Sequence, residues 1–77
     1  METIVDVDVD ARGLNCPLPI LRARKALSGM RSGQTLRVRA TDPGSAKDFT
    51  LFAAQTGHAL LELTEADGEY TILLRKA

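Results

Sequence analysis

The feature that most constrains the fold is the spacing of hydrophobic residues, which switches between two periods along 77 residues. Valine alternates with aspartate over residues 5–10, and this period of two indicates a strand with one buried face. From Pro17 to Met30 apolar residues recur at helical spacing, which predicts a helix that Ser32 and Gly33 end. The chain therefore begins with a strand, a short connector and a helix.

The same switch is repeated in the rest of the chain. We expect a second strand over residues 36–41, a second helix over 46–56 and two further strands over 59–65 and 69–75. Asp67-Gly68 between the last two strands predicts a tight hairpin. Right-handed β-α-β crossovers put both helices on one face of the sheet. The sequence thus predicts one domain, residues 1–77, as an α+β two-layer sandwich in the order β-α-β-α-β-β.

Two signals are expected to start the second helix. Asp42 stands before Pro43, and Ser45 stands three residues before Asp48, a spacing typical of a capping box. Two roles stay open for Asp42. It can cap the second helix, which is the commoner role for such a residue, or it can orient the cysteine loop or a partner at the same edge of the sheet.

Composition limits the classes of function. Cys16 is the only cysteine, which rules out an internal disulfide, and one Cys with one His is a poor start for a zinc site, so we expect no metal. The net charge of zero and the 4% aromatic content disfavour nucleic-acid binding. A lone cysteine suits a reducing compartment, and neither a signal peptide nor a membrane-spanning run is found. We therefore expect a cytoplasmic protein.

The stretch that is typical of chemistry surrounds the single thiol. Cys16 directly precedes Pro17, a residue that suits the first position of a helix, so the thiol is expected at or next to the N-cap. The partial positive charge of a helix N-terminus predicts a lowered thiol pKa, to which Arg12 would add positive potential. Pro17 and Pro19 fix the backbone and would hold the sulfur in one direction.

Three interpretations of Cys16 compete. Free cysteines are usually inert packing residues, but a loop at the end of a parallel strand is a common functional location. A cysteine hydrolase needs a base near the thiol, and the only histidine, His58, follows the second helix and is expected at the opposite end of the sandwich. A thiolate without a base can still accept a sulfur atom as a persulfide and hand it to another thiol.

The stretch from Gly13 to Pro19, Gly-Leu-Asn-Cys-Pro-Leu-Pro, resembles the Cys-Pro-x-Pro signature of the TusA/SirA family of small sulfur-carrier proteins. The resemblance continues through residues 40–45, Asp48-Phe49 and residues 56–58, and covers essentially the whole chain. It implies a mixed sheet of order 1-2-4-3 with an antiparallel fourth strand, and Cys16 as the persulfide site. The residues expected to support Cys16 are Arg12, Gly13, Pro17, Pro19 and Asp42.

The resemblance also implies partners. Relatives receive sulfur from a cysteine desulfurase or a rhodanese-like donor, and pass it to relays for tRNA thiolation, to cofactor synthesis or to sulfur-oxidation enzymes. The chain would then be a monomeric, sulfurtransferase-type relay with no cofactor beyond the transient persulfide. The alternative is a binding or redox-regulatory module in which Cys16 is a sensor or a structural residue. Five basic residues are expected either to dock a sulfur donor or to form a solvated helix face: Arg12, Arg22, Arg24, Lys25 and Lys47.

Overall fold

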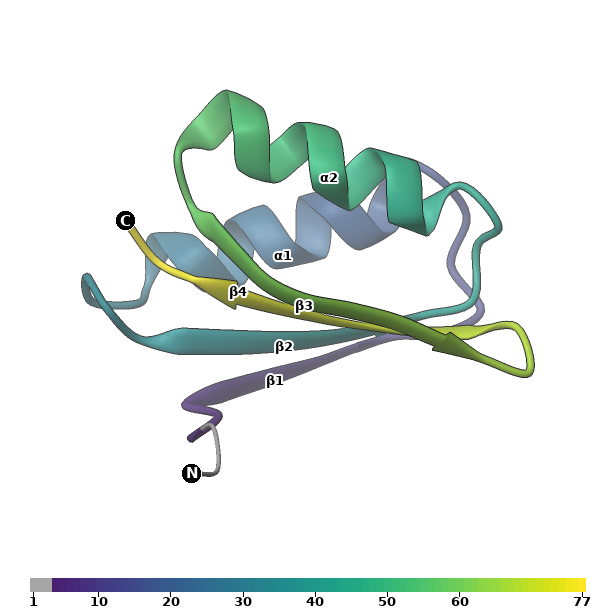
Figure 1. Cartoon of the computed structure of the whole chain (residues 1–77), viewed down its shortest axis with the longest axis horizontal. Helices are drawn as coiled ribbons and strands as arrows, with labels where there is room; N and C mark the ends of the chain where they lie inside the picture. Colours follow the sequence, from purple (N-terminus) through teal and green to yellow (C-terminus); the bar gives the residue numbers. More distant parts are fainter. Residues whose placement is uncertain (1–3) are drawn as a thin grey trace.

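The computed structural model describes residues 4–77. Its elements are β1 (Val7–Ala11), α1 (Leu18–Ser28), β2 (Thr35–Ala40), α2 (Ser45–Thr56), β3 (Ala59–Ala66) and β4 (Glu69–Arg75). The strands form one sheet of order β1-β2-β4-β3, in which β1 and β2 are parallel and β4 is antiparallel to both its neighbours. Both helices cover the same face of this sheet (Figure 1). The predicted two-layer sandwich is confirmed.

The core lies between the sheet and the two helices. Leu36 of β2 and Leu74 of β4 face each other in the antiparallel register, and neither is exposed to solvent. Phe49 from α2 and Leu27 from α1 close the core from above, each with at most 2% of its surface exposed. Burial of such a side chain contributes about 1.5–3 kcal/mol, so this layer of side chains is the main source of stability in a chain without a disulfide.

Helix α1 ends four residues before the predicted end at Ser32. Its last residue is Ser28, and Gly29 donates its N–H to the Ala26 carbonyl. Met30 is still buried although it lies beyond the helix, because its N–H bonds the Leu27 carbonyl and keeps the turn over the core. The apolar spacing in the sequence extends beyond the last helical residue, which is why it predicts too late an end for α1.

The start of α2 also differs from the prediction. The N-cap is Gly44, and no side chain caps the helix. Asp42 Oδ2 accepts the Gly44 N–H at 3.0 Å, which closes a turn directly before the helix, so the prediction of Asp42 as the N-cap is wrong. The predicted capping box is wrong as well: within residues 4–77 the buried hydroxyl of Ser45 has no hydrogen-bond partner.

The hairpin between β3 and β4 follows the prediction. Asp67 has φ 52° and Gly68 has φ 81°, and left-handed values at both central residues define the type I′ turn that Asp-Gly favours. Glu65 Oε2 accepts the Gly68 N–H at 2.8 Å and holds the turn. Over the described part of the chain, neither helix has the length and apolar character required to cross a membrane.

Two leucines of α1 test the assignment of the core. Leu27→Ala should lower the free energy of unfolding by about 2–5 kcal/mol, because the substitution leaves a cavity at a buried position. Leu21→Ala is the matched control in the same helix, since Leu21 is 51% exposed, and it should cost less than about 1 kcal/mol. Urea unfolding followed by circular dichroism measures both. Equal losses in the two variants would contradict the assigned core.

Candidate functional site

The loop between β1 and α1 presents Cys16 to solvent. The thiol is free and exposed, and lies one residue before the helix N-cap, Pro17. Gly13 adopts φ 79°, a left-handed conformation that favours glycine, and its N–H donates to Thr41 Oγ1 at 2.9 Å. This bond ties the cysteine loop to the end of β2. The predicted position of the thiol next to the N-cap is confirmed.

The two prolines shape the start of α1 in different ways. Pro19 is buried in the first turn, whereas Pro17 is exposed at the cap. Neither has an N–H to offer, and the N–H of Leu18 between them donates to the Asn15 carbonyl at 2.8 Å. Residues 17–19 therefore offer the Cys16 thiol no free N–H. This end of the helix gives a thiolate less stabilisation than a helix N-terminus normally provides.

Two acidic groups near the thiol come from α2 and from the loop that leads into it. Cys16 lines a cavity of about 220 Å³ together with Asp48 of α2. A Cβ placed on Gly44 would lie 3.1 Å from Asp42 Oδ2 and 3.6 Å from Asp48 Oδ2, so both carboxylates flank the same glycine. The sequence suggested a capping role for Asp48 and gave no sign of its place beside the thiol, because that contact depends on how the two helices pack.

These carboxylates raise the pKa of the Cys16 thiol above its ordinary value. Hydrogen bonding to the Asp48 carboxylate is the largest cause, followed by desolvation and then by the negative charges of Asp48 and Asp42. The prediction of a lowered thiol pKa is therefore wrong. Its physical reason is that the hydrogen bond to Asp48 of α2, together with the negative charges of Asp48 and of Asp42 in the loop before α2, outweighs the partial positive charge of the α1 terminus.

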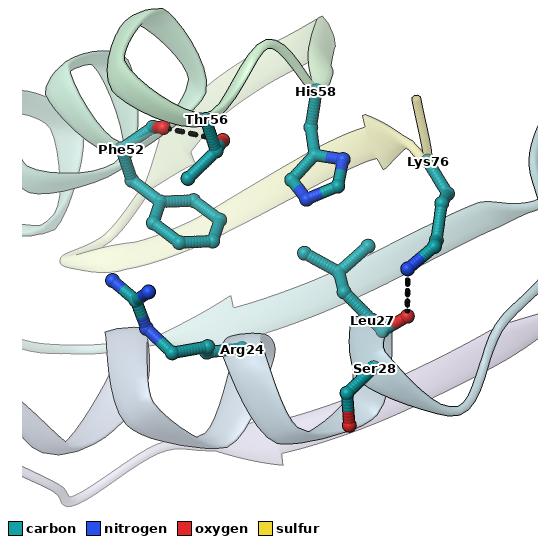
Figure 2. A pocket seen from close by; sticks show the side chains of 7 residues that line it. All are labelled: Arg24, Leu27, Ser28, Phe52, Thr56, His58 and Lys76. Atoms are coloured by element: carbon teal, nitrogen blue, oxygen red, sulfur yellow. Dashed lines mark hydrogen bonds between the residues drawn. The ribbon is translucent and has the colours of Figure 1, made fainter.

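His58 takes no part in this site. It is half-buried directly before β3, and its Nδ1 accepts the N–H of Ala77 at 3.0 Å. It lines a different cavity, at the other end of the helices (Figure 2). The expectation that the thiol and the histidine are apart is confirmed. Over residues 4–77 no group of three or more His, Cys, Asp or Glu side chains is arranged to hold a metal ion.

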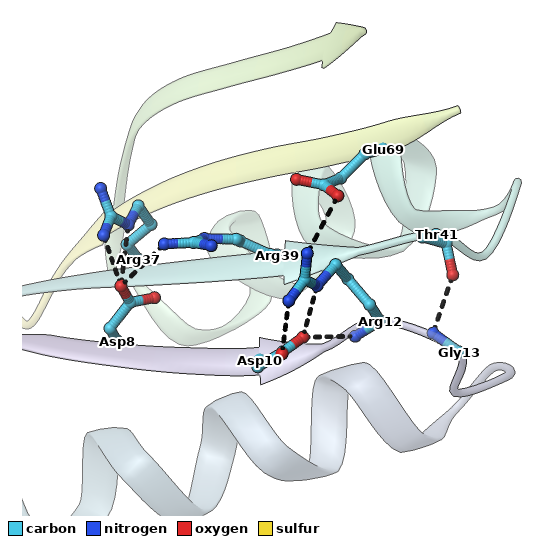
Figure 3. Close-up of polar contacts among 8 residues, drawn as sticks. All are labelled: Asp8, Asp10, Arg12, Gly13, Arg37, Arg39, Thr41 and Glu69. Carbon is cyan, nitrogen blue, oxygen red and sulfur yellow. Dashed lines mark hydrogen bonds and ion pairs between the residues drawn. The ribbon is translucent and has the colours of Figure 1, made fainter. Parts of the chain in front are cut away.

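Arg12 points away from the thiol, onto the open face of the sheet. Its guanidinium donates to Asp10 at 2.8 and 2.9 Å and lies 3.5 Å from Glu69 (Figure 3). This pairing holds the pKa of the Asp10 carboxyl well below its usual range. Next to it, Asp8 forms ion pairs with Arg37 and Arg39 across the two parallel strands. Arg12 therefore does not add to the potential at Cys16, contrary to the prediction.

The other basic residues proposed for docking are divided between different surfaces. Arg24 of α1 lines the cavity of the thiol. Arg22 and Lys25 line a separate cavity on the β1 side of α1, and Lys47 is exposed on α2. Among the five predicted docking residues, Arg24 alone lines the thiol's cavity. The single rim around Cys16 is not formed, and the docking role of these residues stays a prediction.

The Asp48 contact predicts how the thiol titrates. In Asp48→Asn the thiol pKa should fall, because the substitution removes the negative charge that opposes the thiolate. Alkylation by iodoacetamide at pH 7 should then be faster, since a larger thiolate fraction outweighs its slightly lower nucleophilicity. The pH profile of the alkylation rate measures the shift. Asp8→Asn, on the open sheet face, is the control and should leave the profile unchanged; an unchanged profile in Asp48→Asn would contradict the contact.

Known proteins resemble this chain over nearly its whole described length. The model of a protein family described as sulfurtransferase TusA matches residues 7–76. The sulfur carrier protein TusA of Allochromatium vinosum is 58% identical over 72 residues, which cover 94% of this chain and 95% of the relative. The same-named protein of Pseudomonas entomophila is 39% identical over 75 residues, with 97% and 94% covered.

A solved structure shows the same fold. The SirA-like protein from Desulfitobacterium hafniense superposes with a TM-score of 0.79 at 28% identity, over 90% of this chain and 95% of the other. A putative sulfur carrier protein of Neisseria meningitidis is 52% identical over 67 residues, which cover 87% of this chain and 90% of the relative. The family model and these relatives together span nearly the whole described chain. The chain therefore belongs to the TusA sulfurtransferase family.

Proposed function

We propose that this chain is a sulfur carrier that accepts sulfane sulfur as a persulfide on Cys16 and hands it to an acceptor protein. The observation that carries the proposal is the exposed Cys16, the single thiol of a chain in the TusA family. A carrier needs a thiol that two partners can reach in turn. The anchored loop at the end of β1 offers Cys16 in this way without enclosing it.

The transfer needs no general base beside Cys16 and no external oxidant or reductant, because one persulfide is exchanged for another. Cys16 loses its proton, and the thiolate attacks the outer sulfur of a persulfide on the donor protein. A new S–S bond forms on Cys16 while the S–S bond of the donor breaks, and the donor leaves as a thiolate that takes up the proton. The reverse arrangement, with Cys16 as the donor, passes the sulfur to a thiol on the acceptor.

Asp48 controls the reactivity of Cys16 through the protonation state of its thiol. Because its carboxylate raises the pKa of the Cys16 thiol, the unloaded carrier is protonated at neutral pH and reacts slowly with stray electrophiles and oxidants. A donor that brings a positive group to the Asp48 carboxylate would relieve the repulsion and release the thiolate. The carrier then gains reactivity at the moment of docking.

The chemistry indicates the partners. The donor is a cysteine desulfurase or a rhodanese-like protein, both of which hold sulfur as a persulfide, and the acceptor is a relay protein of tRNA thiolation, cofactor synthesis or sulfur oxidation. The carrier works as a monomer, since both partners must reach Cys16. A single exposed thiol is kept reduced in the cytoplasm, which is the compartment that suits this chemistry.

Intact mass spectrometry tests the proposal. After incubation with a cysteine desulfurase and cysteine, the chain should gain one sulfur atom, which a reductant removes, and Cys16→Ser should gain none. A rhodanese with thiosulfate serves as the second donor. If neither donor adds sulfur to the folded wild-type chain, the carrier proposal fails and Cys16 is a structural or regulatory residue.

Arg24 and Arg22 test where the donor docks. Arg24→Glu should slow sulfur loading about tenfold and flatten its salt dependence, because Arg24 borders the cavity of the thiol and would attract an acidic patch on the donor, separate from the positive group that meets Asp48. Arg22→Glu makes the same charge change on the other side of α1 and should have a much smaller effect. The rate of sulfur loading of each variant is measured by stopping the reaction at intervals, at several salt concentrations, and determining the loaded fraction from the intact mass. Equal slowing by the two variants would show that net charge, rather than this surface, steers the donor.

A further inference from the structure

The cavity that Arg22 and Lys25 line is a groove between α1 and the β1 edge of the sheet. It has a volume of about 770 Å³, and its remaining lining residues are Ala26 of α1 and Asp8, Val9 and Asp10 of β1. It shares no lining residue with the cavity of Cys16, so an occupant of this β1 groove would leave the thiol open.

One side of the β1 groove is the backbone of an edge strand. Strand β1 stands at the end of the order β1-β2-β4-β3, and among residues 4–77 it pairs with β2 alone. Alternate N–H and C=O groups along β1 therefore point away from β2, and no second strand takes them up. An edge of this kind is a template for the addition of a further strand.

The helix side of the β1 groove carries two cations. Arg22 and Lys25 are exposed and lie three positions apart, so they share one side of α1. Neither forms an ion pair within the described residues, and α1 itself contains no acidic residue. The C-terminus of α1 brings roughly half a negative charge near Lys25, which two full positive charges exceed.

The carboxylates that border the groove are already paired. On the open face of the sheet they belong to a cluster in which three carboxylates meet three guanidinium groups (Figure 3): Asp8, Asp10 and Glu69 with Arg12, Arg37 and Arg39. This cluster is neutral as a whole. The charge left over at the groove is therefore positive and belongs to the two cations of α1.

We propose that the β1 groove binds an extended acidic segment of a partner protein, which joins the sheet as a further strand beside β1. The backbone of the segment pairs with the free N–H and C=O groups of the edge, and its carboxylates on the helix side meet Arg22 and Lys25. Val9 and Ala26 are half-buried, so they still offer an apolar floor between the edge and the cations.

A second copy of the chain is a poor occupant of the groove. Antiparallel pairing of two β1 edges would place both α1 helices on the same side of the joined sheet, where the cations of one copy would meet those of the other. Such like charges oppose association, whereas an acidic segment complements them. The opposite edge, β3, is interrupted by a register shift between Leu60 and Glu62, which makes it a poorer template than β1.

A short capped peptide that alternates glutamate with threonine is the probe. It should shift the amide signals of β1 and of residues 22–26 in a saturable way, and the outward-pointing amides of β1 should exchange with solvent at least about fivefold more slowly in its presence. Replacing each glutamate by glutamine removes the charge, and replacing each threonine by proline removes backbone donors. Each change should weaken binding at least about fivefold.

Three results would overturn the proposal. The first is equal binding of the proline peptide or of the glutamine peptide, and the second is saturable shifts confined to β3 or to the surroundings of Cys16. The third is the absence of saturable shifts or of slower exchange in β1.

Variants locate the site. Arg22→Gln and Lys25→Met should each weaken binding of the glutamate peptide about threefold or more, because each removes one of the two cations. Lys47→Met makes the same change as Lys25→Met on α2, outside the groove, and should bind the peptide like the wild type. Unchanged binding in both groove variants would contradict the assignment. The readout is peptide binding rather than sulfur loading, so its failure would leave the sulfur-carrier proposal standing.

Discussion

The parallel pairing of β1 with β2 is the constraint on which the functional site depends. The register pairs Ala11 with Ala40, so both strands end at the same edge of the sheet and both following loops leave from it. The Gly13 bond to Thr41 Oγ1 joins these loops directly. The start of α2 is thereby brought against the loop that carries Cys16. Residues 26 or more positions away in sequence, Asp42 and Asp48, become the electrostatic surroundings of the thiol.

The helix layer separates two chemical environments. At one end the thiol faces carboxylates, which favour its protonated form. At the other end Lys76 and Arg24 border a cavity that no Asp or Glu side chain lines among the described residues. Arg24 and Phe52 border both cavities, so the same pair of side chains forms the boundary between them.

Periodicity predicted the order of the elements and the layers, because burial of one face enforces a period of two in strands and a helical period in α1 and α2. The Asp-Gly hairpin was predictable for a similarly local reason, since the turn itself demands left-handed backbone at both residues. The end of α1 was predicted too late because Met30 continues the apolar spacing, although a non-helical turn buries it equally well. The thiol pKa was predicted in the wrong direction, because local sequence shows the α1 terminus beside Cys16 but not the carboxylates that helix packing brings there. The separation of Arg22 from Arg24, by contrast, follows from helix geometry, because residues two positions apart on α1 point in different directions and line different cavities.

In the function we propose, the free carrier holds its thiol protonated until a partner docks. The most direct measurement is the titration of the Cys16 ¹³Cβ chemical shift in the unloaded wild-type chain. We expect a midpoint above the ordinary thiol value of about 8.5, because a hydrogen bond to Asp48 and nearby negative charge disfavour the thiolate. A midpoint clearly below that value would show that the helix terminus dominates and would contradict the account.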